Sequence, residues 1–200
     1  MKKAALLLLF SVISTIGFAG YITITGKSFL PNEPIKVGIK HDPFTLIDIH
    51  LAMDETAADS SFEFTLENTG SVKEIYLEMN DFKGYFFVDT SGNYEVHMLA
   101  PLGDFSPNQA NKRTHILILN EPTEINKPIR EFNQNTTDFL TSNYKAFISM
   151  QGKSVVKDFV KNNKPEPVEH PFVFAFKEYA LTSMTYAVSK KNYAEVQRQM

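Results

Sequence analysis

Histidine and acidic side chains are the residues of this sequence most able to do chemistry, and their spacing decides which chemistry. The five histidines are at positions 41, 50, 97, 115 and 170, and none forms the short pair that zinc sites use. His41, Asp42 and Asp48 are near enough in sequence to meet across a hairpin, and strand alternation puts His50 on the same face as Asp48. We favour the interpretation of a polar, solvated sheet face. The sequence therefore predicts no metal site and no cofactor.

Other catalytic patterns are also incomplete. The acidic segment DETAADSSFE and the turns at Asp81 and Asp89 lack the alternating oxygen ligands of a calcium loop. The Gly-x-Ser-x-Gly motif of hydrolases and the glycine-rich phosphate loop are missing. Because the chain has no cysteine, it can carry neither a disulfide nor dithiol redox chemistry. We expect a chain without catalytic residues, and not an enzyme.

The segment DFKGYFFVDTSGNYEV, residues 81–96, is unusually rich in aromatic rings. Strand alternation places Phe86 and Val88 on one face, and Tyr85 and Phe87 on the other. Most of these rings are therefore predicted to be buried. Since both faces are apolar, we expect this to be where the strands contact the helices described below.

Three residues of this segment are candidates for contact with a ligand or partner. Phe82 lies in the predicted turn before the strand, and Tyr85 and Tyr94 carry hydroxyl groups that can reach outward from a hairpin. Tyr94 shares a face with Val96 on the return strand. We predict that Phe82, Tyr85 and Tyr94 are the residues through which this segment contacts a ligand or partner.

The first nineteen residues have the pattern of a secretory signal peptide. Lys2 and Lys3 precede an apolar run at 4–18, and Ala19 provides a small residue for cleavage. The run is shorter than the roughly 20 residues that span a bilayer. We therefore expect an exported protein, periplasmic or extracellular, with no stable membrane insertion after cleavage.

Residues 20–100 alternate apolar and polar side chains in short runs separated by turn residues. Such alternation indicates strands with one buried and one solvated face. The predicted strands lie at 21–25, 35–40, 47–54, 62–66, 72–79, 84–88 and 94–99. Short strands with a turn every eight to twelve residues or so are typical of an antiparallel β-sandwich. We expect about seven strands in this domain.

Beyond residue 100 the pattern changes twice. Residues 101–128 form a connector in which 116–119 is one further candidate strand. Residues 129–200 have helical spacing, with Pro128 at the first helical position, a first helix ending at Gly152, a shorter one near 155–160 and a third opened by Pro171. A last helical pattern begins at Asn192. The fold class is therefore α+β, a sandwich followed by a segment of three to four helices.

Three stretches resemble a known family. They are DSSFEFTL at 59–66, EIYLEMNDFKGYFFVDTSGNYEVHMLAP at 74–101 and PFVFAFKEYALTSMTYAVSKKNYAEVQ at 171–197. Their order and spacing resemble the N-terminal half of exported thioredoxin-like, disulfide-reductase-type proteins of the Bacteroidota. In that family the redox Cys-x-x-Cys pair belongs to a later thioredoxin domain. The resemblance implies either a truncated reading frame or a stand-alone accessory half, and it carries over no catalytic residue.

Two classes of function are left open by the sequence. The first is a noncatalytic accessory or interaction module of the cell envelope, with an envelope protein as its partner. The second is an independent ligand-binding sandwich, for example for glycan, that uses exposed aromatic rings. Aromatics on inward strand positions favour the first, and loop-borne rings favour the second. The net charge of −3 predicts no nucleic-acid partner.

Overall fold

The structure, a computed structural model, describes residues 20–40, 48–68, 70–101, 112–148 and 152–188. The chain divides into two compact units between Thr123 and Glu124, and each unit is described by itself below. The expected signal peptide, the helical pattern from Asn192, and His41 and Asp42 lie outside the described residues.

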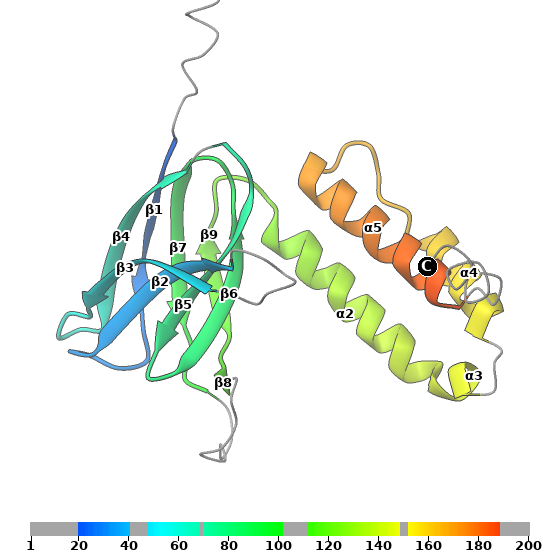
Figure 1. The fold of residues 1–200 in the computed structure, drawn as a ribbon, viewed down its shortest axis with the longest axis horizontal. Coiled ribbons are helices and arrows are strands. Elements are labelled where there is room, and N and C mark those ends of the chain that lie inside the picture. Colours follow the sequence, from blue (N-terminus) through cyan, green and yellow to red (C-terminus); the bar gives the residue numbers. More distant parts are fainter. Residues whose placement is uncertain (1–19, 41–47, 69, 102–111, 149–151, 189–200) are drawn as a thin grey trace, which may run out of the picture. The chain divides into compact units, whose positions relative to one another are not determined.

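The first unit is a β-sandwich of two sheets (Figure 1). Its strands are β1 (Gly20–Lys27), β2 (Pro34–Lys40), β3 (Asp48–Glu55), β4 (Ser61–Asn68), β5 (Lys73–Met79), β6 (Phe82–Val88), β7 (Gly92–Met98), β8 (Lys112–Arg113) and β9 (Ile116–Asn120). The four-stranded sheet has the order β4-β1-β7-β9, and the five-stranded sheet has the order β3-β2-β5-β6-β8. All seven strands expected before residue 100 are present, and 116–119 is confirmed as part of β9.

The expectation of a purely antiparallel sandwich is wrong, because the sheets are mixed. β1 runs parallel to β7, and β6 runs parallel to the two-residue strand β8. Alternation of side chains reports which face a residue occupies but carries no information about the direction of the neighbouring strand. The α+β fold class itself is confirmed.

The core lies between the sheets and follows the period of two. It is made of alternate residues of six strands: Ile22, Ile24, Ile35, Val37, Phe62, Phe64, Leu66, Ile75, Leu77, Met79, Phe86, Val88, Tyr94, Val96 and Met98. Burying one face of each strand in this way provides most of the stabilisation of such a small domain.

The aromatic hairpin is two-sided, as the alternation predicts. Phe86 and Val88 are buried in the core, whereas Tyr85 and Phe87 are half-buried on the other face of β6. Phe82 lies in β6, opposite Met79, and not in the turn. The turn is shorter than expected because Asn80 and Asp81 both take positive φ and close it in two residues. Whether helices cover the outer face of β6 stays a prediction.

The second unit contains α2 (Asn126–Ser142), α3 (Tyr144–Ile148), α4 (Gly152–Asn162) and α5 (Pro171–Ala187) among the described residues (Figure 1). Aromatic pairs hold the helices together. The ring of Phe139 in α2 stacks on that of Phe159 in α4, with centroids 4.2 Å apart. Phe132 of α2 meets Phe176 of α5 edge to face at 6.4 Å.

The helix boundaries differ from expectation at two points. α2 begins at Asn126, which places Pro128 third, where a backbone N–H has no intrahelical acceptor in any case. α2 ends at Ser142 and not at Gly152. Its C-cap is Asn143, whose side-chain amide donates to the carbonyl of Phe139 at 2.9 Å, and Gly152 starts a helix instead of ending one. Pro171 opens α5 as predicted, with His170 as its N-cap. None of the helices within the described ranges is long and apolar enough to cross a membrane.

Candidate functional site

The candidate site is a polar and aromatic cluster on the outer face of the five-stranded sheet. Tyr76 of β5 occupies an outward strand position, since its neighbours Ile75 and Leu77 face the core. Its side chain is nevertheless 0% exposed. Other side chains of this face therefore cover it, and we call the group Lys36, Asp48, His50, Tyr76, Glu78 and Lys83 the Tyr76 cluster.

Gly38 makes room for the Tyr76 ring. The two residues are paired across β2 and β5, and a Cβ atom at Gly38 would overlap with the ring and the hydroxyl of Tyr76. Because glycine has no side chain, the ring can lie across β2 toward β3. This is a close approach that no other residue at position 38 allows without movement.

A β-bulge in β3 brings His50 to the end of that ring. Val37 pairs with Ala52, but the next residue, Gly38, pairs with His50, so that Leu51 is the extra residue. Bulges of this kind redirect a side chain on an edge strand. As a result the Tyr76 hydroxyl lies 2.9 Å from His50 Nδ1, and the two rings meet edge to face with centroids 6.0 Å apart.

Lys83 covers the Tyr76 ring from above. Its ammonium group lies 4.7 Å from the ring centroid, within the range of a cation–π contact. The same Nζ atom donates to Asp48 Oδ2 at 2.6 Å and lies 3.1 Å from Glu78 Oε2. Lys36 Nζ donates to the other oxygen of Glu78 at 3.0 Å. The lysines therefore tie β2, β3, β5 and β6 together across the face.

The environment shifts the ionisation of three of these groups. Burial raises the pKa of Tyr76 to about 12, so its hydroxyl keeps its proton at physiological pH. For Lys83, burial acts to lower the pKa, but hydrogen bonds to Asp48 and Glu78 outweigh it and raise the pKa. For Glu78, burial acts to raise the pKa, but the bonds from Lys36 and Lys83 hold it below its usual value. At neutral pH the cluster thus contains an ammonium ion at Lys83, a carboxylate at Glu78 and a neutral phenol at Tyr76.

The acid sensitivity of the sandwich should depend on Glu78. A carboxyl group whose pKa is lower in the folded state stabilises the fold above the unfolded pKa, near 4.5. That contribution is lost as the pH falls through the folded pKa. We expect Glu78→Gln to lower the free energy of unfolding by about 1–2 kcal/mol at neutral pH. The effect is kept small because Lys36 is partly exposed, so that water screens its ion pair with Glu78. The variant should also lose less stability than the wild type as the pH falls below about 4.5.

Urea titrations of the wild type and the variant across that pH range measure this effect. The control is Glu63→Gln, because Glu63 is exposed on the other sheet. Equal acid sensitivity of wild type and Glu78→Gln would show that the lysines do not hold this carboxylate.

The structure separates the three residues predicted as contacts. Tyr85 lies beside the Tyr76 cluster, half-buried between the Tyr76 ring at 6.0 Å and the Arg113 guanidinium at 5.9 Å. Phe82 is half-buried, packs against the core and meets Phe29 edge to face at 6.2 Å. Tyr94 is 1% exposed in the core, and its hydroxyl accepts from the Asp89 backbone N–H at 2.6 Å. Only Tyr85 therefore lies on the outer face.

Tyr76 and Lys83 were not recognisable from the sequence as members of a site. The sequence did indicate that Asp48 and His50 share the outer face of β3. In the structure Asp48 binds Lys83, and His50 binds Tyr76. Within the described ranges, no group of three histidine or acidic side chains is placed to hold a metal ion.

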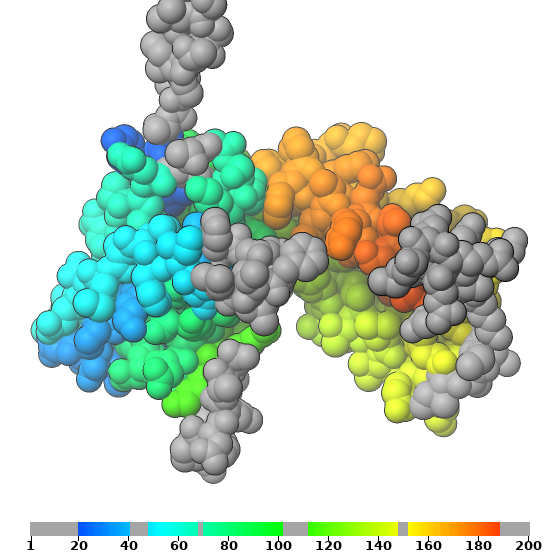
Figure 2. Space-filling view, viewed as in Figure 1, coloured from blue at the N-terminus to red at the C-terminus, as the bar shows by residue number. Residues whose placement is uncertain are grey.

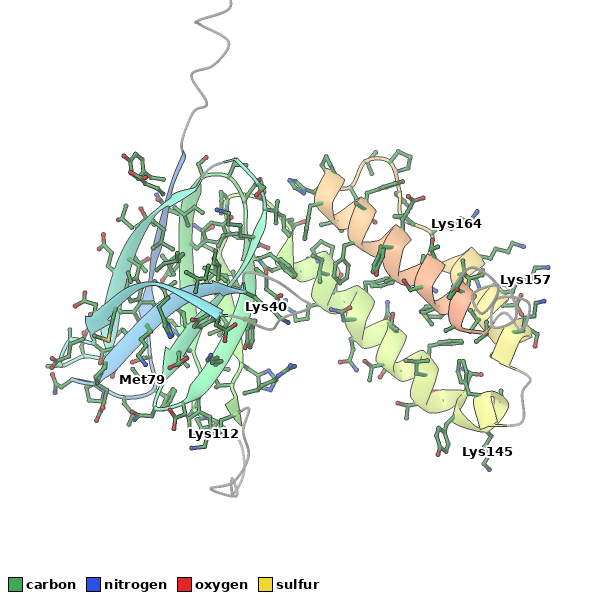
Figure 3. The ribbon with its side chains drawn as sticks, in the orientation of Figure 1. Lys40, Met79, Lys112, Lys145, Lys157 and Lys164 are labelled. Carbon is green, nitrogen blue, oxygen red and sulfur yellow. The ribbon has the colours of Figure 1, made fainter. Side chains whose placement is uncertain are left out.

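Two hollows lie elsewhere in the described residues. One, of about 500 Å³, is at the end of the sandwich and is lined by Lys27, Glu63, Glu95 and His97 among others. The second, of about 440 Å³, lies between α4 and α5 beside Val160, Leu181 and Lys164, which is labelled in Figure 3. Both hollows are open to solvent and mainly lined by side chains at the surface.

Comparison with protein-family models and with curated proteins finds no match to this sequence. The likeness to thioredoxin-like proteins stays a prediction from the sequence.

Proposed function

We propose that this chain is a noncatalytic interaction module of the cell envelope that binds a partner protein, similar to the front half of thioredoxin-like exported proteins. Its binding face is the outer side of the five-stranded sheet, formed by the Tyr76 cluster and the neighbouring strand β3. Export and the envelope location are parts of the proposal, supported by the signal-peptide pattern of residues 1–19.

The observation that carries this proposal is the kind of apolar side chain that the sandwich exposes. Among the described residues of the sandwich, the exposed large apolar side chains are Tyr21, Ile49, Leu51, Met53, Leu99, Leu117 and Leu119. Six of these seven are aliphatic, and β3 alone carries three of them. Sugar rings bind to flat aromatic faces, whereas aliphatic side chains on an edge strand suit another polypeptide. This supports a protein partner over a glycan.

The strand β3 is also accessible as an edge. It is the first strand of the five-stranded sheet and pairs with β2 only, among the described residues. Figure 2 shows its atoms, in cyan, at the surface of the sandwich. Met53 is 68% exposed and Leu51 is 43% exposed. Both side chains can therefore contact a partner without any other part of the sandwich moving away first. An edge strand that has exposed aliphatic residues is a common protein-binding element.

Affinity capture from envelope extract tests the proposal. We expect the immobilised mature chain to retain a protein that the double variant Leu51→Glu/Met53→Glu does not retain, because two carboxylates cannot be buried in the contact. The matched control is Leu119→Glu, which adds a charge at an exposed leucine of the other sheet.

Equal capture by all three chains would show that the β3 face is not the binding site. A glycan array in which binding is lost in Tyr85→Ala, but kept in the β3 variant, would support the ligand-binding alternative instead.

A further inference from the structure

We propose that His50 is the recognition residue of this face, and that its Nε2–H group binds a carboxylate in an acidic segment of the partner protein. The inference rests on the proposed function, since it specifies the chemistry of the partner at the same face. It follows from the hydrogen bonding of Tyr76, from the exposed charge of the face and from the side chains beside His50.

The buried hydroxyl of Tyr76 fixes the tautomer of His50. A hydroxyl group has one hydrogen to donate, and leaving it unpaired inside a protein is unfavourable. Within the described residues, His50 Nδ1 is the hydrogen-bond partner that the structure gives this hydroxyl. Neutral His50 must therefore accept at Nδ1 and carry its own proton at Nε2.

The Nε2–H group of His50 is then an exposed hydrogen-bond donor in a fixed orientation. The imidazole is exposed, and the structure pairs its Nε2 atom with no side chain or backbone group among the residues described. The hydrogen bond at Nδ1 and the edge-to-face contact with Tyr76 restrict rotation of the ring. A partner that supplies an acceptor oxygen gains this bond at a reduced entropic cost.

Two lysines of β2, Lys36 and Lys40, flank Gly38, the residue paired with His50. The acidic groups of the Tyr76 cluster are largely covered, with Glu78 11% and Asp48 24% exposed, and both are held by lysines. Lys36 is 38% exposed, and Arg113 is exposed at the other side of the face. Lys40, labelled in Figure 3, lies on β2 opposite Asp48. The exposed carboxylates of β3, Asp54 and Glu55, lie toward the other end of the strand, opposite Ile35 and Pro34. Because the charges of β2 nearest to His50 are those of Lys36 and Lys40, an anionic acceptor oxygen, a carboxylate, is favoured here.

The neighbours of His50 favour a polypeptide as the source of that carboxylate. Leu51 follows His50 in the bulge, and Met53 pairs with Lys36 on the same face. These exposed side chains offer apolar contact directly beside the donor. A protein segment with an apolar residue next to Glu or Asp contacts both the Nε2–H donor of His50 and the apolar side chains of Leu51 and Met53. A small carboxylate contacts only the donor.

NMR of the imidazole nitrogens of the full mature chain tests the first step. We expect His50 in its neutral form to be protonated at Nε2 and unprotonated at Nδ1. The variant Tyr76→Phe removes the hydroxyl and should give a mixture of the two tautomers. A wild-type His50 protonated at Nδ1 would overturn the proposal.

Peptide titration of the same chain tests the second step. The probe is a short blocked peptide with one glutamate between two leucines, and the control peptide has glutamine in its place. We expect the glutamate peptide to shift the His50 Nε2 resonance and to bind about tenfold more tightly than the control. His50→Asn keeps an acceptor for Tyr76 but lacks the Nε2–H donor, so it should lose that preference. No binding, or equal binding of both peptides, would overturn the proposal.

The two proposals fail in different ways. If the captured envelope protein is lost in the β3 variant but kept by His50→Asn, the binding face is right and the role of His50 is wrong. If no protein depends on β3, the proposed function fails, whichever tautomer His50 adopts.

Discussion

Replacing Tyr94 by alanine should lower the free energy of unfolding of the sandwich by about 3–5 kcal/mol, the cost of removing a large buried aromatic side chain. Tyr94 is almost completely buried, pairs with Ile24 of β1 and packs beside Phe86, with ring centroids 6.3 Å apart. Hydrogen exchange of the most protected amides of β1 and β7 measures the effect, because it reports on the sandwich separately from the helices.

Two control variants separate the parts played by the ring and the hydroxyl. Tyr94→Phe keeps the ring and loses the hydrogen bond from the Asp89 backbone, so it should cost only about 0.5–1.5 kcal/mol. Tyr21→Ala removes an exposed tyrosine of the same sheet and should change stability by less than about 0.5 kcal/mol. A Tyr94→Ala cost as small as that of Tyr21→Ala would contradict the buried position of Tyr94.

Replacing Gly38 by alanine should cost about 1–3 kcal/mol through overpacking and should separate Tyr76 from His50. The added Cβ atom would overlap with the Tyr76 ring and would lie 2.5 Å from the backbone oxygen of Ile49. The ring must therefore leave its place, or β3 must move away from β2. Denaturation measures the loss of stability, and the imidazole resonances of His50 report whether the hydrogen bond remains.

A double-mutant cycle with position 76 shows whether the ring causes the cost. In a Tyr76→Leu background the space above Gly38 is partly empty, so Gly38→Ala should be less destabilising there by about 0.5 kcal/mol or more. Equal costs in the two backgrounds would show that the strain lies in the backbone contact with Ile49 and not in the ring.

The strands were predictable, and so were the inward faces of all but β3, because burial has a direct sequence signal. In β3 the alternating apolar residues Ile49, Leu51 and Met53 are exposed, because this edge strand carries a bulge at Leu51. Ile22 and Ile24, or Phe62 and Phe64, alternate with polar residues, and each pair is buried in the core. Phe86 and Val88 share the inward face for the same reason. The hairpin turn is shorter than predicted, because two consecutive residues with positive φ, Asn80 and Asp81, were not expected.

The candidate site was predictable only in part. That Asp48 and His50 share one face follows from the period of two, and the structure confirms it. Tyr76 was assigned to a strand, but nothing in its local sequence indicated that an outward tyrosine would be fully buried. Its burial depends on Gly38 in β2, on the bulge at Leu51 in β3 and on Lys83 in β6.

The sequence by itself determined the fold class, seven of the strands, the start of the helix at Pro171 and the absence of thiol chemistry. Each of these depends on neighbouring residues or on composition, which a single sequence displays in full. Only the tertiary structure decided the direction of β7 beside β1 and the contact of Tyr76 with His50. Strand pairing and register bring together residues far apart in the chain, and neither side-chain alternation nor composition records which strands become neighbours.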